Sequence, residues 1–236
     1  SMVDVALLEY CVREDLKTRV ESRNVVENPL KVIITNYPED KTEMMEIENN
    51  KEVPEMGSRM VPFSRELWVD GADFQEVPEK KYFRLFPGNE VRFKGAYFIT
   101  CNEVVKNEDG SIKELLCTYD PETRSGSGFE GRKVKGTIHW VPAPFAKKCE
   151  VRLYENLVDE EKGVYNKEDG SLNLNPNSLT VIKDAYVEPS FADAKAYDSF
   201  QFVRNGYFCI DAKDSTAEYP VFNRIVSLKS SFKLPK

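Results

Sequence analysis

Ten short apolar segments, separated by turn-forming residues, constrain the fold of this chain more than any other feature of its sequence. They are rich in β-branched and aromatic residues, which favour strands, and turn residues such as Gly, Pro, Asn and Asp follow them. The segments are residues 31–35, 67–69, 82–86, 91–100, 115–119, 134–141, 150–154, 179–187, 207–210 and 221–228. So many brief strands predict a mainly β protein with sandwich or barrel architecture.

A single helix is expected, over residues 3–20. Leu8, Val12 and Leu16 recur with helical spacing, Asp4 is suited to cap the first turn, and no Gly or Pro interrupts the segment. The charged residues expected on its polar face are Glu9, Arg13, Glu14 and Lys17. The pattern predicts one amphipathic helix at the start of a β protein.

Glycine-containing turns occur at three places. Residues 107–111 and 167–171 both contain Asp-Gly-Ser, and Asp-Gly supplies the positive φ of a tight hairpin turn. Residues 120–131 are polar and rich in Gly and Ser, which predicts a long loop. This loop lacks the Gly-Lys-Ser/Thr ending of phosphate-binding loops, so the sequence does not support a nucleotide site there.

The composition is that of a globular protein. Among 236 residues, 33 Lys and Arg face 40 Asp and Glu, giving a net charge of −7, and 41% are hydrophobic. These values argue against disorder, and no apolar run is long enough for a membrane span. The five cysteines are scattered, with no Cys-x-x-Cys pair, and the chain starts with acidic rather than signal-like residues. We therefore expect reduced thiols and a cytoplasmic location.

Few residues are suited to catalysis. His139 is the only histidine, and its position between Ile138 and Trp140 in a strand-like run favours a hydrogen-bonded core residue. The acidic clusters at residues 43–48 and 159–161 lack calcium-loop spacing and are expected to be solvated faces. We predict no catalytic residue, metal site or bound cofactor in this chain.

Basic and aromatic residues alternate between residues 80 and 94. The basic ones are Lys80, Lys81, Arg84, Arg92 and Lys94, and the aromatic ones are Tyr82, Phe83, Phe86 and Phe93. Guanidinium groups suit phosphates and base edges, and aromatic rings stack on unpaired bases, so the cluster suits single-stranded RNA. The same alternation would also suit a half-exposed strand with no ligand.

Several longer motifs resemble one known family in order along nearly the whole chain. Residues 131–141, Gly-Arg-Lys-Val-Lys-Gly-Thr-Ile-His-Trp-Val, are similar to a strand of the C-terminal anticodon-binding region of glutaminyl-tRNA synthetases. The other matching segments are residues 12–16, 54–59, 61–64, 67–70, 119–120, 200–209 and 221–224. The family's two nucleotide-binding motifs have no counterpart here.

The resemblance implies two antiparallel β-barrels, the distal one inserted into the proximal one, after a connecting helix at residues 1–20. The proximal barrel would comprise residues 21–36 and 138–236, and the distal barrel residues 37–137. His139 and Trp140 would pack at their junction. The implied partners are the anticodon loop of tRNA(Gln) and the chain's own N-terminal catalytic domain, which would use ATP. A monomer is expected.

The resemblance also implies roles for residues in the basic cluster. Arg84 falls where the family has an arginine that reads the third anticodon base, a guanine whose O6 and N7 suit a guanidinium. Lys81 lies beside it, where the family often has other residues. Arg92 matches an arginine directed at the backbone and the first base. Lys94 stands where another arginine is common, and lysine keeps the charge but loses the planar fork.

Further site residues are implied outside that cluster. Arg23 and Gln201 align with the pair that holds the central uracil, with Arg204 in support, and a glutamine amide can donate and accept at a uracil edge. Lys133 and Lys135 are expected to face the RNA backbone. Two other functions stay open: the same region of a eukaryotic-type glutamyl-tRNA synthetase, and a barrel scaffold that binds no RNA.

Overall fold

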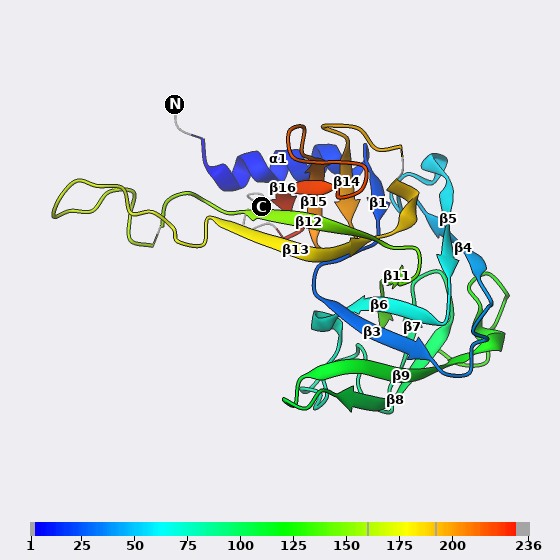
Figure 1. The fold of residues 1–236 in the computed structure, drawn as a ribbon. Helices are drawn as coiled ribbons and strands as arrows, with labels where there is room; N and C mark the ends of the chain where they lie inside the picture. Colours follow the sequence, from blue (N-terminus) through cyan, green and yellow to red (C-terminus); the bar gives the residue numbers. More distant parts are fainter. Residues whose placement is uncertain (1–2, 160, 192, 230–236) are drawn as a thin grey trace.

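Two curved sheets, each of seven strands, form most of the structure (Figure 1). The computed structural model describes residues 3–159, 161–191 and 193–229. One sheet is nearly closed and the other is a half-barrel, and one α-helix lies at the N-terminal end. The predicted mainly β fold with two barrel-like units after a helix is therefore confirmed.

Sheet A is built from the two ends of the chain. In spatial order its strands are β1 (Glu21–Arg23), β14 (Ser199–Phe202), β15 (Gly206–Ile210), β16 (Val221–Ser227), β12 (Lys147–Tyr154), β13 (Leu179–Val187) and β2 (Val25–Val26). The segment between β12 and β13 is a long arm that projects from the body of the protein (Figure 1).

Sheet B is built from the middle of the chain, so it is inserted between β2 and β12 of sheet A. In spatial order its strands are β10 (Thr137–Ile138), β7 (Glu90–Phe93), β8 (Phe98–Lys106), β9 (Ile112–Asp120), β3 (Pro29–Ile34), β6 (Glu66–Asp70) and β11 (Val141–Pro142). A separate hairpin of β4 (Glu43–Glu48) and β5 (Ser58–Phe63) lies beside both sheets (Figure 1). Short 3-10 turns are η1 (Pro54–Met56), η2 (Gly71–Asp73), η3 (Pro121–Thr123) and η4 (Pro189–Phe191).

Strand pairing differs from the expected pattern in two respects. β3 lies within residues 21–36, which we assigned to the proximal barrel, yet it pairs with β6 and β9 in sheet B. Four strand pairs are parallel, so the barrels are mixed rather than purely antiparallel: β1 with β14, β7 with β10, β12 with β16 and β3 with β9. The exact limits of the two barrels as domains stay a prediction.

The edge strands of each sheet follow one another in the chain, which curls each sheet toward closure. Only Asn24 separates β1 from β2, and only His139 and Trp140 separate β10 from β11. These two short links bond to each other. The Asn24 side-chain amide donates to the Trp140 carbonyl at 3.0 Å, and His139 Nε2 lies 2.9 Å from the Val25 carbonyl. The predicted packing of His139 and Trp140 at the junction is confirmed.

A buried ion pair also joins the β4–β5 hairpin to sheet A. The Arg59 guanidinium on β5 forms a bidentate salt bridge with the Glu188 carboxylate, with Nε–Oε1 at 2.5 Å and Nη2–Oε2 at 2.7 Å. Glu188, which follows β13, has no exposed surface, and it also accepts the Asn24 backbone N–H at 2.7 Å. The junction between the sheets is therefore held by charged groups as well as by apolar packing.

The helix α1 (Val5–Lys17) is capped by Asp4 as predicted, because the Asp4 carboxylate accepts the Ala6 N–H at 2.8 Å. Its apolar stripe is shorter than expected. Val12 and Leu16 pack against Tyr207 and Val226 of sheet A, whereas Leu8 is 60% exposed.

Arg13 was expected on the polar face of this helix, and that expectation is wrong. Its side chain is buried, and Nε donates to the Ser227 carbonyl at 2.5 Å.

In the described part of the chain, no helix is long and apolar enough to cross a membrane. All five cysteines lie in that part and are free thiols.

The segment 82–86 is not the strand that its apolar residues predicted. It belongs to an irregular loop between η2 and β7, in which Leu85 makes an isolated bridge with Phe74 and Pro87 makes another with Cys101 of β8. Lys81 precedes it with a φ of 65°, a left-handed conformation that breaks an extended run. Residues 91–100 were expected to form one strand. They instead belong to two strands, β7 and β8, with a turn at residues 94–97 between them.

Candidate functional site

Three cavities adjoin one another where the two sheets and the β4–β5 hairpin meet. We call them the outer cavity, the junction cavity and the hairpin cavity, with volumes of about 590, 190 and 500 Å³. Arg204 lines both the outer and the junction cavity, and Lys94 lines both the junction and the hairpin cavity. The three cavities are therefore neighbours in series, with Arg204 between the first two and Lys94 together with Glu48 between the second and third.

The outer cavity contains most of the basic residues. Lys81, Arg84, Lys135 and Arg204 line it, and no acidic side chain among the described residues does. The Arg84 side chain is 44% exposed. Phe83 is also exposed, and Lys135 Nζ lies 4.9 Å from the centre of its ring. The cavity thus combines positive charge with an accessible aromatic face.

The wall of the outer cavity requires glycine at position 136. A Cβ atom there would lie 2.0 Å from the Phe83 carbonyl oxygen and 3.2 Å from a Val91 methyl group. The absence of a side chain therefore lets the loop that carries Phe83 and Arg84 pack directly on the backbone beside β10.

We expect Gly136→Ala to lower the free energy of unfolding by about 1–3 kcal/mol, because the clash is with backbone and can be relieved only by moving the loop. Urea denaturation measures this loss. Thr137→Ala, at the exposed neighbouring position, is the matched control and should leave stability nearly unchanged. Equal stabilities of the Gly136 variant and the parent protein would contradict the close packing.

The junction cavity brings together residues from both sheets. Gln201 on β14 and Ser22 on β1 come from sheet A, and Lys94 follows β7 of sheet B. The backbone of Lys94 is fixed by the junction segment, because its N–H donates to the Ile138 carbonyl and its carbonyl accepts Trp140 Nε1, both at 2.9 Å. Burial lowers the pKa of the Lys94 ammonium, while the charge of Glu48 opposes that shift.

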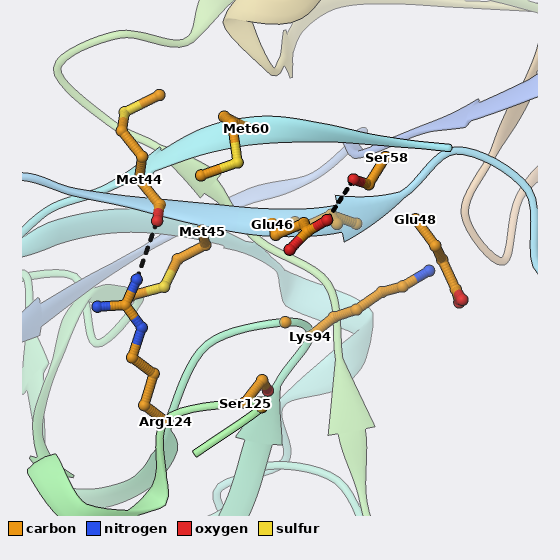
Figure 2. Close-up of a pocket in the computed structure, with 12 residues that line it drawn as sticks. Met44, Met45, Glu46, Glu48, Ser58, Met60, Lys94, Arg124 and Ser125 are labelled. Atoms are coloured by element: carbon orange, nitrogen blue, oxygen red, sulfur yellow. Dashed lines mark hydrogen bonds between the residues drawn. The ribbon is translucent and has the colours of Figure 1, made fainter. Parts of the chain in front are cut away.

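The hairpin cavity lies under the β4–β5 hairpin (Figure 2). Met44, Met45 and Met60 line it together with Glu46, Lys94 and Arg124. Figure 2 shows Lys94 extending along one side toward Glu48, and Arg124 donating to the Met44 carbonyl, at 3.1 Å. The cavity therefore combines methionine side chains with charged groups, among them Glu46 and Glu48 of the hairpin itself.

One buried carboxylate contacts two arginines of the site. Asp73, at the end of η2, is 2% exposed, and its Oδ1 lies 3.1 Å from Arg84 Nη1 and 2.8 Å from Arg204 Nη1. Arg84 comes from the loop before β7, whereas Arg204 lies in the turn between β14 and β15, with a φ of 69°. Burial and the charge of Asp73 together raise the pKa of the nearby Tyr82 to about 12.

Five of the eight predicted site residues line this series of cavities. They are Lys81, Arg84, Lys94, Gln201 and Arg204. Lys133 is exposed but lines none of the three cavities, whereas its neighbour Lys135 does line the outer one. The structure therefore brings together residues that are up to 123 positions apart in the sequence, from Lys81 to Arg204.

Arg92, on β7, is held by the turn that follows this strand and by the 120–131 loop. Its Nη1 donates to the carbonyls of Ala96 and Thr123 and to the Ser125 hydroxyl, at 3.1, 3.0 and 2.8 Å. Its guanidinium also lies 4.3 Å from the centre of the Phe98 ring, and burial lowers its pKa. The structure gives Arg92 the role of fixing the 120–131 loop, beside the hairpin cavity.

Arg23 and Gln201 do not share a cavity. Ser22 is paired with Gln201 across β1 and β14, and successive side chains of a strand point to opposite faces, so Arg23 points away from Gln201. Its buried guanidinium lies 5.4 Å from the centre of the Phe200 ring and pairs with Glu21 at 2.6 Å. It lines a separate cavity of about 430 Å³.

Some residues of the site were not predicted. Asp73 and Arg124 were not singled out, and Glu43 was expected to be solvated. In the structure Glu43 is mostly buried and accepts the hydroxyls of Tyr37 and Tyr97, at 2.8 and 2.9 Å. The Asp70–Asp73 segment carries only a local signal, a cap of η2 in which Asp70 accepts the Ala72 N–H. Nothing in that signal indicates ion pairs with distant arginines.

Comparison with known proteins gives matches along most of the chain. Residues 23–120 and 137–211 each match the anticodon-binding domain of the class I (E and Q) tRNA synthetases. A glutamine–tRNA ligase of Clostridium perfringens is 54% identical over 99% of this chain, and one of Clostridioides difficile is 56% identical over 99%. A third, from Stutzerimonas stutzeri, is 48% identical over 98%.

The chain spans 42% of the length of each of these three relatives. The segments matched by the family include every strand of sheet B and most of sheet A, with β16 and the start of β1 outside them. Lys94 lies in the first matched segment and Arg204 in the second. From these matches and from the paired barrel-like sheets, we conclude that the chain belongs to the family of anticodon-binding domains of the class I (E and Q) tRNA synthetases.

Proposed function

We propose that this chain is the anticodon-binding part of a glutamine–tRNA ligase and that its series of cavities receives the unpaired anticodon bases of tRNA(Gln). The observation that supports this most is that Arg84, Arg204 and Gln201 line adjoining cavities rather than separate faces. Sequence-specific RNA recognition usually targets unstacked bases of a loop, which are splayed apart and read individually. A row of cavities with hydrogen-bonding groups at each boundary suits such a substrate.

The chemistry of each cavity supports a role in base recognition. In the outer cavity, Arg84 presents a planar guanidinium that can donate twice to the O6 and N7 of a guanine, which we assign to the third anticodon base. In the junction cavity, the Gln201 amide can both donate to and accept from the edge of a central uracil. Lys94, at the boundary with the hairpin cavity, carries a charge suited to a phosphate or to the first nucleotide.

The net charge of −7 is compatible with an RNA ligand because charges act locally. At physiological salt the Debye length is about 8 Å, so distant acids are screened, while Lys81, Arg84, Lys135 and Arg204 lie around one cavity. We assign ATP and the aminoacylation step to the catalytic domain of the full-length protein and predict that this chain alone binds tRNA without charging it.

A filter-binding titration with tRNA(Gln) and a non-cognate tRNA at two salt concentrations tests the proposal. We expect tighter binding of tRNA(Gln) at both concentrations. If about three phosphates are contacted, a threefold rise in salt should weaken binding on the order of tenfold. No binding at low salt would favour a scaffold without RNA affinity. Preference for an anticodon with another third base would favour the glutamate enzyme.

A further inference from the structure

Asp73 is placed to control two base-reading arginines at once. Its Oδ1 takes part in two ion pairs, one with Arg84 Nη1 at 3.1 Å and another with Arg204 Nη1 at 2.8 Å. Each guanidinium uses its Nη1 for this contact. In the described part of the chain, Nη2 and Nε of both arginines make no hydrogen bond, so two donors of each planar fork stay available to a ligand.

The carboxylate itself cannot move freely. Asp73 is 2% exposed, and its backbone carbonyl accepts the Leu85 N–H at 3.0 Å, which ties η2 to the loop that carries Arg84. Its second oxygen, Oδ2, is buried without a hydrogen-bond partner among the described residues and lies 3.9 Å from Nδ1 of the buried His139. Burial lowers the pKa of His139, which favours the neutral ring. The two arginines are therefore the cations that balance this buried charge.

The two arginines would otherwise be poorly fixed. Arg84 has 44% of its side chain exposed and Arg204 has 30%, and they project from a loop and a turn that belong to different sheets. Long exposed side chains have many rotamers, and fixing them costs conformational entropy when a ligand binds. A buried anion that holds both guanidinium groups before binding reduces that cost at two neighbouring cavities.

We propose that Asp73 is a positioning residue that sets the orientation of Arg84 and Arg204 together and so couples the recognition of the central and the third anticodon base. This inference rests on the proposed function. It also predicts that removing the negative charge of Asp73 affects specificity and affinity differently. Without the anion, the two arginines keep their attraction for phosphates and lose their fixed direction, so specificity falls while general RNA affinity does not.

Asp73→Asn tests the inference, because asparagine keeps the size and one acceptor oxygen of the side chain. The probes are the anticodon stem-loop of tRNA(Gln) and three versions with the first, the central or the third anticodon base replaced. We expect the variant to lose about tenfold in discrimination at the central base and about tenfold at the third base, and to keep the wild-type discrimination at the first base. A further stem-loop, in which the central and the third base are both replaced, should bind to the variant as tightly as to the wild type or more tightly.

The matched control is Asp214→Asn, which makes the same change at a carboxylate that pairs with Arg152 at 2.8 Å, away from the three cavities. It should leave all discrimination unchanged. A uniform loss of affinity for every probe in Asp73→Asn, or a loss at one base only, would overturn the inference. If the wild-type protein discriminates and Asp73→Asn discriminates equally, the inference fails alone. If the wild-type protein shows no preference among the probes, the proposed function fails with it.

A second variant avoids any change in the buried core. Arg204→Gln lies in an exposed turn and removes one of the two cations that share Asp73. Because the arginines are coupled through one oxygen, we expect the preference for the third base, which Arg84 reads, to change by about twofold or more although Arg84 is intact. An unchanged third-base preference in Arg204→Gln would show that the two arginines act independently and would also overturn the inference.

Discussion

Arg84→Ala is expected to weaken binding of the cognate anticodon stem-loop by about 1–3 kcal/mol and to relax the preference for the third base. The reason is geometric. Arg84 lines the outer cavity with an exposed guanidinium, and its position relative to Asp73 fixes the direction of the fork. Competition titrations with stem-loops that differ only at the third base measure both effects.

Arg84→Lys separates charge from geometry. Lysine keeps the positive charge but cannot donate in a planar fork, so we expect near-normal binding of non-cognate stem-loops with a reduced third-base preference. The control is Arg19→Ala, which removes an exposed arginine that is paired with Asp15 on the surface. If Arg84→Ala and Arg19→Ala bound all stem-loops alike, Arg84 would have no part in base recognition.

Glu188→Ala is expected to have the largest effect on stability, a loss of about 3–5 kcal/mol in the free energy of unfolding. Glu188 has no exposed surface, and its carboxylate accepts hydrogen bonds from Nε and Nη2 of Arg59. Its removal therefore leaves a buried cation without its partner. It also leaves the Asn24 N–H unpaired at the link between β1 and β2. Urea unfolding followed by tryptophan fluorescence measures the loss, since Trp140 lies in the junction.

An exposed ion pair gives the contrast for this variant. Lys148 and Asp184 pair across β12 and β13 with largely exposed side chains, so Asp184→Ala should change stability little. The double variant Arg59→Met with Glu188→Leu should recover part of the loss, because replacing both charges leaves no unpaired ion. A loss in Glu188→Ala as small as that in Asp184→Ala would mean that the junction does not depend on the buried pair.

The helix, most strands and the hairpin turns could be predicted because their signals are local. The two Asp-Gly turns form as expected, and in both the aspartate accepts the N–H and the hydroxyl of the following serine. Errors arose where distant parts of the chain cover a segment. The helical pattern gives Arg13 a polar position on α1, yet the end of β16 lies against it and supplies a carbonyl.

The candidate site also has some features that local signals predict and others that depend on distant parts of the chain. The basic and aromatic residues between 80 and 94 pointed to RNA, and the resemblance indicated which of them to test. Arg92 and Lys94 are both basic residues outside the core pattern of β7, but the 120–131 loop folds over Arg92 and binds it, while Lys94 faces two cavities. Sequence spacing cannot distinguish the two, because the covering loop is about 30 residues away in the chain.

The short strands, the capped helix, the turns and the family could all be inferred from the residues alone, since each depends on residue types at short spacing or on motifs in order. The folded arrangement was needed to find that Arg84, Arg204 and Gln201 line neighbouring cavities and that Asp73 pairs with both arginines. Those relations depend on how two sheets close against each other through Asn24, His139 and Trp140. Contacts between residues more than 100 positions apart follow from that closure and not from any local pattern.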